Sequence, residues 1–189
     1  KDFSDIYKFT DAENIFINAQ SPELTKRLKD GNKYTGKEVD GWQISSVAVS
    51  VTVVKFVMQS GKRILKQKSG LLGSHNVGPL AVAVAISARL GLTDTQIAEG
   101  VAKTLPFEHR LQPYDLGGAT ILDDTYNGNL EGMKAGLELL KILPAKRKIY
   151  VTPGLVEQGE DYIKIHQELG SFIAKANPDK VVLMNNSTT

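Results

Sequence analysis

The chain has 189 residues, 41% of them hydrophobic and 23% charged, which is ordinary for a globular protein and excludes disorder of the whole chain. Its 23 basic and 21 acidic residues leave a net charge of +2. We therefore expect no nucleic-acid partner, because such proteins carry a clear basic excess. The absence of cysteine excludes disulfides, thiolate metal sites and cysteine nucleophiles. The longest apolar runs, 47–58 and 79–92, are shorter than the roughly 20 residues of a membrane span, so we expect no membrane insertion.

The first elements expected along the chain are a strand at 14–19 and a helix directly after it. Ser21 can cap this helix, Pro22 suits its first position, and Gly31 ends the pattern. The next stretch, GNKYTGKE at 31–38, resembles a phosphate-binding loop but ends in glutamate where such loops need serine or threonine. We interpret it as a lysine-rich surface connection.

Residues 41–68 are rich in valine and isoleucine, alternate in polarity up to position 53, and predict strands joined by turns. The alanine-rich stretch Pro79–Leu90 then predicts a buried helix. Thr93 followed by Gln96 predicts a capping box at the start of a second helix, which runs to about residue 104.

Two prolines and two glycines in 106–118 mark a domain boundary, so we expect one domain at 1–112 and another at 113–189. The second part alternates strands with helices, which predicts a parallel sheet with right-handed crossovers. Its expected elements are strand 119–124, helix 130–143, strand 148–152, helix 161–176 and strand 180–184. The fold class is thus α/β: mixed strands and helices, followed by a Rossmann-like parallel βαβαβ domain that looks truncated.

Two short stretches before this second part carry side chains suited to nucleotides. His75 and Asn76 precede the buried helix, where an amide can read an adenine edge and helix N–H groups favour anions. Arg110 lies at the expected domain junction, where its planar cation can clamp a phosphate or ribose. The alternatives are a packed histidine and a surface arginine. His166 has no metal-ligand spacing and is expected to be solvated on its helix.

The heptapeptide DDTYNGN, 123–129, follows the apolar run ATIL and places two carboxylates, a phenol and two amides at the carboxyl end of a strand. Ligands bind at this edge of α/β sheets, and adjacent carboxylates are costly there unless something uses them. The alternative is a strand-to-helix turn in which Asn129 caps the helix. Both interpretations stay open from the residues alone.

The ordered series GSHN, RLQPY, ILDDTYNGN, GMKAGLELL and LVEQGE closely resembles the Mur ligase family, the ATP-dependent enzymes that add amino acids to the peptidoglycan precursor. The motif order is most like that of members that join D-alanyl-D-alanine to a UDP-muramoyl peptide. The resemblance implies that the chain holds the later part of the central ATP-binding domain and the start of the C-terminal ligase domain. Because the chain does not begin with Met, we expect it to start inside a longer protein and to be inactive alone.

Carried onto this sequence, the resemblance implies a nucleotide site of five residues. His75 and Asn76 would contact the adenine side of ATP, and Arg110 would reach the nucleotide from the hinge. Asp123 or Asp124 would bind the ribose.

The resemblance further implies that Tyr126, Asn127 and Asn129 shape the amino-substrate side of the cleft. The activity implied is formation of an acyl phosphate from the peptide carboxylate and ATP, followed by attack of the amine. The ligands for Mg²⁺ are expected upstream of Lys1. A cytoplasmic, monomeric enzyme with UDP-muramoyl peptide and D-alanyl-D-alanine as substrates is expected.

Several positions depart from the family pattern and keep other functions open. The proline of the DDSYNANP-like motif is Leu130 here, and the aspartate and methionine of the G-D-M-x-E-L-G-like motif are lost, although Glu157 and Gly159 remain. The alternatives are a paralogous ligase for another carboxylate and a non-catalytic module that binds nucleotide or a partner. A dinucleotide-binding domain is disfavoured, because no G-x-G-x-x-G follows a predicted strand.

Overall fold

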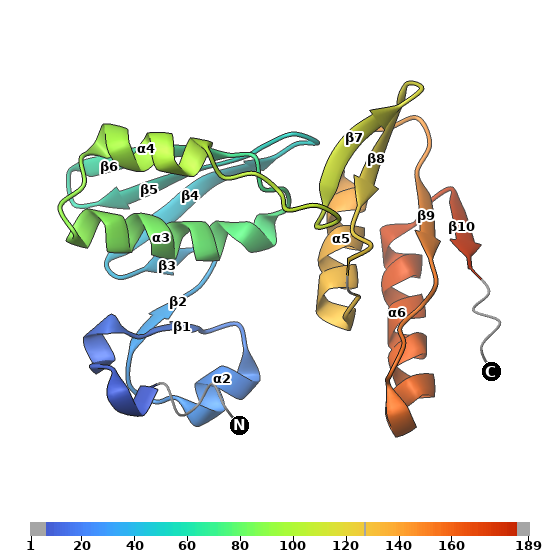
Figure 1. Ribbon diagram of the computed structural model, residues 1–189, viewed down its shortest axis with the longest axis horizontal. Helices are drawn as coiled ribbons and strands as arrows, with labels where there is room; N and C mark the ends of the chain where they lie inside the picture. Colours follow the sequence, from blue (N-terminus) through green and yellow to red (C-terminus); the bar gives the residue numbers. More distant parts are fainter. Residues whose placement is uncertain (1–6, 127, 185–189) are drawn as a thin grey trace. The chain divides into compact units, whose positions relative to one another are not determined.

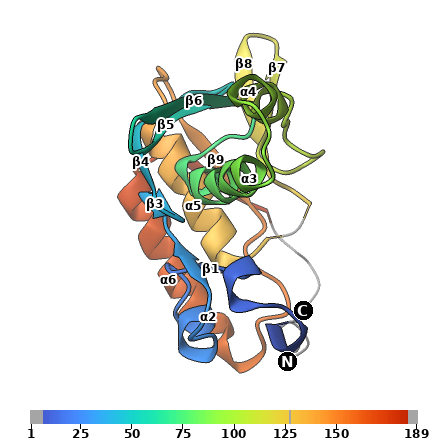
Figure 2. The same ribbon diagram turned by 90° about the vertical axis from the view of Figure 1, so that its left-hand side faces the viewer.

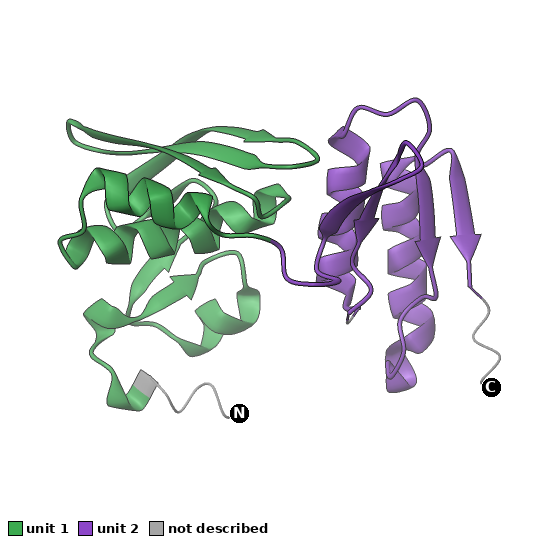
Figure 3. Cartoon of the chain, turned by 45° about the horizontal axis from the view of Figure 1, so that its top comes forward, with its two compact units in different colours: residues 1–105 green, residues 106–189 purple. Residues whose placement is uncertain are grey.

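The computed structural model describes residues 7–126 and 128–184. The chain divides into two compact units, unit 1 at Lys1–Leu105 and unit 2 at Pro106–Thr189 (Figure 3). Each unit is described here by itself. None of the helices in the described ranges combines the length and apolar character needed to cross a bilayer.

Unit 1 is built on a six-stranded mixed sheet in which the strands follow chain order (Figure 1). The strands are β1 (Phe16–Asn18), β2 (Asn32–Tyr34), β3 (Glu38–Val39), β4 (Trp42–Val49), β5 (Val54–Ser60) and β6 (Arg63–Ser69). Its helices are α2 (Pro22–Arg27), α3 (Val77–Arg89) and α4 (Asp94–Ala102), with 3-10 turns at Tyr7–Phe9, Ala12–Asn14 and Ser74–Asn76. β1 and β2 pair in parallel, and all later neighbours pair antiparallel.

The helices α2 and α4 of unit 1 begin at the capping residues predicted from the sequence. Ser21 accepts a hydrogen bond from the Leu24 N–H, and Pro22 occupies the first turn of α2. At α4 the Thr93 side chain accepts from the Gln96 N–H while the Gln96 side chain accepts from the Thr93 N–H. The predicted capping box is therefore confirmed.

The interpretation of residues 31–38 as a plain surface connection was wrong. Asn32–Tyr34 forms β2 and pairs in parallel with β1, while Glu38 and Val39 form β3. Strands of two or three residues with mixed polarity have too little alternation to be recognised in the sequence. No helix follows Lys37, which agrees with the rejection of a phosphate-binding loop.

The strand-rich stretch 41–68 forms the antiparallel meander β4–β5–β6 and turns at Gly61 as predicted. The alternation does not continue unbroken to position 53, because the β4–β5 register shifts between Ser45 and Ala48 and β4 ends at Val49. Ser46 has a φ of 52°, which is consistent with a bulge at this point.

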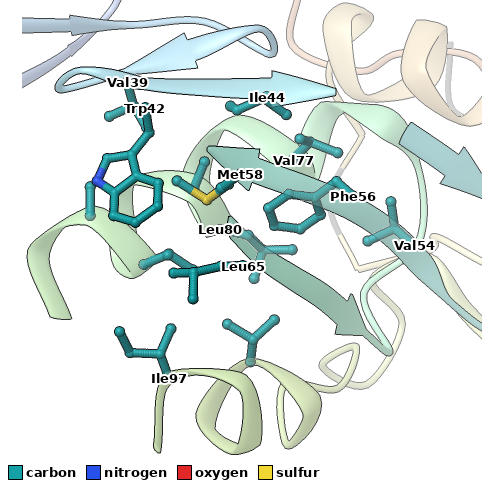
Figure 4. Close-up of a cluster of buried hydrophobic side chains, with 14 residues drawn as sticks. Val39, Trp42, Ile44, Val54, Phe56, Met58, Leu65, Val77, Leu80 and Ile97 are labelled. Atoms are coloured by element: carbon teal, nitrogen blue, oxygen red, sulfur yellow. The ribbon is translucent and has the colours of Figure 1, made fainter. Parts of the chain in front are cut away.

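The core of unit 1 lies between the meander and the two helices α3 and α4, which lie side by side on one face of the sheet (Figures 1 and 2). Phe56 and Met58 of β5 lie at its centre beside Leu80 of α3 (Figure 4). Trp42 packs at one side of the same cluster, and Ile97 joins it from α4. This apolar cluster holds α3, and with it the His75-Asn76 turn, against the sheet.

One polar side chain in this region is buried without a hydrogen-bond partner in the described part of the chain. Gln67 of β6 is 3% exposed, and neither its amide nitrogen nor its amide oxygen is bonded. An unpaired buried polar group costs about 1–3 kcal/mol. The amide therefore weakens unit 1.

Gln67→Leu is expected to raise the free energy of unfolding of unit 1 by about 1 kcal/mol, since it removes the unpaired amide and keeps an apolar side chain of similar size. Urea unfolding followed by the fluorescence of Trp42, the single tryptophan of the chain, reports unit 1 selectively. Gln43→Leu, at an exposed position of β4, is the matched control and should leave stability nearly unchanged. A loss of stability in Gln67→Leu would show instead that the amide is satisfied in solution.

Unit 2 consists of two short sheets and two helices. Its elements are β7 (Gln112–Leu116), β8 (Ala119–Asp123), α5 (Leu130–Ile142), β9 (Ile149–Thr152), a 3-10 turn (Gly159–Asp161), α6 (Tyr162–Ala176) and β10 (Lys180–Leu183). β9 and β10 pair in parallel, as a βαβ unit requires. α5 and α6 pack through Leu137, Leu169 and Ala176. The α/β fold class is confirmed. The expected parallel βαβαβ order was wrong at its first strand, because β8 pairs antiparallel with β7, and within the described residues the parallel sheet of unit 2 consists of β9 and β10.

Residues 106–118, which were expected to mark a domain boundary between regular elements, contain a strand in their second half. Gln112–Leu116 forms β7, which pairs antiparallel with β8 through a turn at Gly117 and Gly118, both with positive φ. The units divide between Leu105 and Pro106, before this hairpin, rather than after Gln112. Because Gln112 pairs with Asp123, it is an integral part of unit 2.

Candidate functional site

The heptapeptide after β8 and the segment before β7 meet in unit 2. The β7–β8 hairpin pairs Gln112 with Asp123, so residues just before β7 lie beside those just after β8. The Tyr126 N–H donates to the His109 carbonyl at 3.2 Å, and the Leu111 N–H donates to Asp124 Oδ1 at 3.2 Å. The two segments thus form one local structure at the end of the hairpin.

Asp123 uses both carboxylate oxygens within this structure. His109 Nδ1 lies 2.8 Å from Oδ2, while Oδ1 accepts from the Thr125 N–H at 3.1 Å and from the Thr125 hydroxyl at 2.7 Å. The hydrogen bond from His109, followed by that from the Thr125 side chain, holds the pKa of Asp123 below its ordinary value of 3.8. The same bond raises the pKa of His109 above 6.5. Asp123 is therefore the anchor of the turn.

Asp124 accepts fewer hydrogen bonds than Asp123. Its Oδ1 accepts from Leu111, and it makes no other side-chain hydrogen bond within the described ranges. Burial, and then the negative charge of Asp124, raise the pKa of Tyr150 on β9 despite the opposing hydrogen bond to Thr152. Of the two carboxylates, Asp124 keeps more capacity for a ligand.

Arg110 and Tyr126 form a stacked pair on the exposed side of the same structure. The Arg110 guanidinium carbon lies 4.5 Å from the centre of the Tyr126 ring, and both side chains are exposed. A guanidinium stacked on a ring keeps its N–H donors in one plane for a phosphate or hydroxyl. The structure thus brings together four predicted site residues: Arg110, Asp123, Asp124 and Tyr126.

The remaining residues of the heptapeptide lie at the start of α5. Asn129 Oδ1 accepts from the Gly132 N–H at 2.8 Å, which confirms the predicted helix cap. Asn127 lies outside the described residues. Gly128, which follows β8, lies close to Leu155, which follows β9: a Cβ added at Gly128 would be 3.4 Å from the Leu155 side chain. The segments that follow these two strands are therefore neighbours in unit 2.

The expectation that His166 is simply solvated was wrong. His166 Nε2 accepts from the Leu155 N–H at 3.0 Å, its Nδ1 lies 2.8 Å from the Tyr162 carbonyl oxygen, and its ring stacks on Tyr162 at 4.0 Å. Gly154 has a φ of 82°, and a Cβ there would approach Nε2 to 2.8 Å. His166 therefore holds the loop after β9 against α6. No sequence motif links His166 to this loop, so the contact could not be predicted from the sequence.

His75 and Asn76 lie in unit 1, in the 3-10 turn that leads into α3. Asn76 Nδ2 donates to the Leu72 carbonyl at 2.5 Å and lies 3.1 Å from His75 Nε2. Gly73 has a φ of 84°, and a Cβ there would lie 2.5 Å from the His75 ring. The turn therefore needs glycine at 73 and presents an ordered histidine and amide at the N-terminal end of α3.

Magnesium has no fitting site among the residues that the structure describes, because they contain no group of three His, Asp or Glu side chains able to hold a metal ion.

Comparison with curated proteins gives relatives that share one name. The chain is 34% identical over 117 residues to the UDP-N-acetylmuramoyl-tripeptide--D-alanyl-D-alanine ligase of Synechocystis, covering 61% of this chain and 26% of the relative. It is 33% identical over 118 residues to the enzyme of the same name from Haemophilus influenzae, covering 62% and 26%. The chain thus spans about a quarter of these relatives' length. No family model matches it.

Solved structures agree in fold. MurF from Acinetobacter baumannii superposes with a TM-score of 0.80 at 22% identity, covering 95% of this chain and 40% of that one. MurF ligase from Thermotoga maritima in complex with ADP gives a TM-score of 0.66 at 20% identity, covering 91% and 44%.

The architecture therefore defines the class: the chain carries the fold of Mur ligases, and its resemblance to that family is confirmed. Within the class, the relatives reported above are of the D-alanyl-D-alanine-adding type, to which the motif order also pointed.

Proposed function

We propose that this chain is part of an ATP-dependent amide ligase of peptidoglycan precursor synthesis, which acts in the cytoplasm and joins D-alanyl-D-alanine to a UDP-muramoyl peptide. The sequence similarity to the curated ligases supports the substrates. The observation that carries the proposal is the exposed Arg110–Tyr126 stack beside Asp124, at the end of the β7–β8 hairpin, where a planar cation and a carboxylate with spare acceptor capacity lie together. The ADP complex of the Thermotoga maritima relative supports the nucleotide.

We assign unit 1 to the central ATP-binding domain and unit 2 to the C-terminal ligase domain. In this assignment His75 and Asn76 contact the adenine side of ATP, and Arg110 binds the nucleotide. Asp124 binds the ribose, because Asp123 is fully engaged by His109 and Thr125.

Binding of the amino substrate is assigned to Tyr126, Asn127 and Asn129. Asn129 keeps its amide N–H groups for a substrate, since its Oδ1 caps α5. The exposed phenol of Tyr126 offers a further hydroxyl beside Arg110.

The proposed reaction has two steps. A carboxylate oxygen of the peptide attacks the γ-phosphorus of ATP, which releases ADP and leaves an acyl phosphate. The amine then attacks the acyl carbon, loses a proton and expels phosphate, which leaves the amide. Such transfer depends on positioning and charge neutralisation, and the residues above would supply part of both.

Phosphate release by the full-length natural protein tests the proposal. Release is expected only when ATP, UDP-muramoyl-tripeptide and D-alanyl-D-alanine are all present. Asp124→Ala should raise the KM for ATP about tenfold, the effect of losing one hydrogen bond to a charged group. Nucleotide binding without release would favour a non-catalytic module, and release with another carboxylate would favour a paralogous ligase. An unchanged KM for ATP in Asp124→Ala would refute the assignment of the ribose to Asp124, and a raised KM in Asp123→Ala alone would move the ribose to Asp123.

A further inference from the structure

The backbone around Arg110 adopts a conformation that needs support. His109 has a φ of 59° and Leu111 a φ of 46°, so left-handed residues flank the arginine on both sides. Such values are uncommon for residues other than glycine, and least common for a branched side chain such as leucine. They persist only where the surroundings hold them in place.

Three hydrogen bonds supply that support from the residues after β8. The His109 ring bonds Asp123, the His109 carbonyl accepts from Tyr126, and the Leu111 N–H donates to Asp124. Two of the three involve His109, and its ring makes the shortest of them, at 2.8 Å. The Asp123 carboxylate also accepts a hydrogen bond from the Thr125 hydroxyl, which fixes its orientation, so the His109 ring is bonded to an ordered side chain.

We infer that His109 is a positioning residue: its ring bond to Asp123 fixes the left-handed turn that presents Arg110, stacked on Tyr126, to the nucleotide. The inference rests on the proposed function for its nucleotide, but the turn itself is observable without any ligand. The sequence offers no motif for this role, because only the β7–β8 pairing brings His109 to Asp123.

The charge of the ring strengthens the bond. The groups around it are Asp123 at 2.8 Å, Glu108 at 3.6 Å from Nε2, and the neighbours Arg110 and Asp124. Since the folded-state pKa of His109 is raised, the histidine's contribution is complete below its ordinary value of 6.5 and is lost as pH rises through the raised value. Since that of Asp123 is lowered, its contribution is present above 3.8 and is lost as pH falls through the lowered value.

Two substitutions separate the bond from the backbone conformation. Glycine accepts a φ of 59° freely, so His109→Gly removes the ring without adding strain. Asparagine also tolerates the left-handed region, and its amide can donate to Asp123 without titrating. Glu108→Gln, which changes the other carboxylate beside the ring, is the matched control.

The test measures ADP affinity of the full-length protein by calorimetry between pH 5.5 and 8.5, with amide hydrogen exchange of residues 109–126 in the absence of ligand. His109→Gly should bind ADP about tenfold more weakly at pH 6, the size of one charge-assisted hydrogen bond, and should exchange faster at Arg110 and Leu111. His109→Asn should restore affinity and lose the decline with pH that the natural protein shows. Glu108→Gln should match the natural protein at pH 6, where the Asp123 bond stays intact, and should show its decline in affinity at a somewhat lower pH, because the Glu108 charge helps to raise the His109 pKa.

Unchanged exchange and unchanged ADP affinity in His109→Gly would overturn the inference. If the natural protein binds no ADP, the proposed function fails, and the exchange data alone then decide the role of His109: faster exchange at Arg110 in His109→Gly, reversed in His109→Asn, supports it, and equal exchange refutes it.

Discussion

Arg110→Ala in the full-length protein is expected to weaken ADP binding by about 10- to 100-fold. The guanidinium is exposed, stacked 4.5 Å above the Tyr126 ring, and fixed by a backbone that is bonded on both sides. A hydrogen bond to a charged group contributes about 1.5–3 kcal/mol, and each 1.4 kcal/mol is a factor of ten. Equilibrium binding measured by calorimetry checks the effect.

Four further variants test the assignment more closely. Arg110→Lys should recover only part of the affinity, because lysine keeps the charge but lacks the planar fork. Tyr126→Leu should weaken binding and Tyr126→Phe should not, if the ring matters through stacking. Arg63→Ala is the matched control, since Arg63 also lies over an aromatic ring and pairs with a carboxylate, Asp94, in unit 1. Equal losses in Arg63→Ala and Arg110→Ala would contradict the assignment.

Phe56→Ala is expected to destabilise unit 1 by about 3–5 kcal/mol. Phe56 is 1% exposed at the centre of the cluster between the β4–β6 meander and the helices α3 and α4, so its removal leaves a cavity. A domain has only about 5–15 kcal/mol of stability in total. The variant should therefore be unfolded to a large extent at moderate urea, and α3 with its His75-Asn76 turn should lose its support.

Urea unfolding followed by Trp42 fluorescence measures this loss in unit 1. Ile64→Ala is the control, because Ile64 is 55% exposed on β6 and the same kind of truncation there should change stability by less than about 0.5 kcal/mol. A Phe56→Ala transition that coincides with that of Ile64→Ala would show that the cluster is not the core of unit 1.

Local signals in the sequence predicted the elements that depend on local interactions. The capping box at Thr93 and the cap at Asn129 involve residues three positions apart, so both could be recognised from the sequence. The strands of the meander were predicted from the valine and isoleucine content of residues 41–68 and from the turn at Gly61, and the buried face of β5 is formed by Val54, Phe56 and Met58. These elements need little information from distant parts of the chain.

The missed features depend on the pairing of one strand with another. β2 exists because β1 offers it a parallel partner, and β7 because the Gly117-Gly118 turn folds it back on β8. His109 was missed for the same reason: its role follows from the pairing of Gln112 with Asp123. Two adjacent glycines between Tyr114 and the strand at 119–124 were the signal that could have revealed the hairpin, and with it the histidine.

The motif series was more informative than any residue type taken alone. The sequence did not show which of Asp123 and Asp124 would bind a ligand. In the structure Asp123 is bonded to His109 and Thr125, whereas Asp124 accepts one hydrogen bond from Leu111 and keeps acceptor capacity for a ligand. Likewise His166 had no recognisable spacing, yet its ring holds the loop after β9.

Isotope transfer is the most direct test of the central proposal, that the natural protein forms an amide through an acyl phosphate. The full-length protein would be given ATP, D-alanyl-D-alanine and UDP-muramoyl-tripeptide labelled with ¹⁸O in its terminal carboxylate, and the released phosphate would be analysed by mass spectrometry. We expect one ¹⁸O atom in each phosphate released, together with the amide product. Phosphate without label, or no phosphate at all, would contradict the proposal.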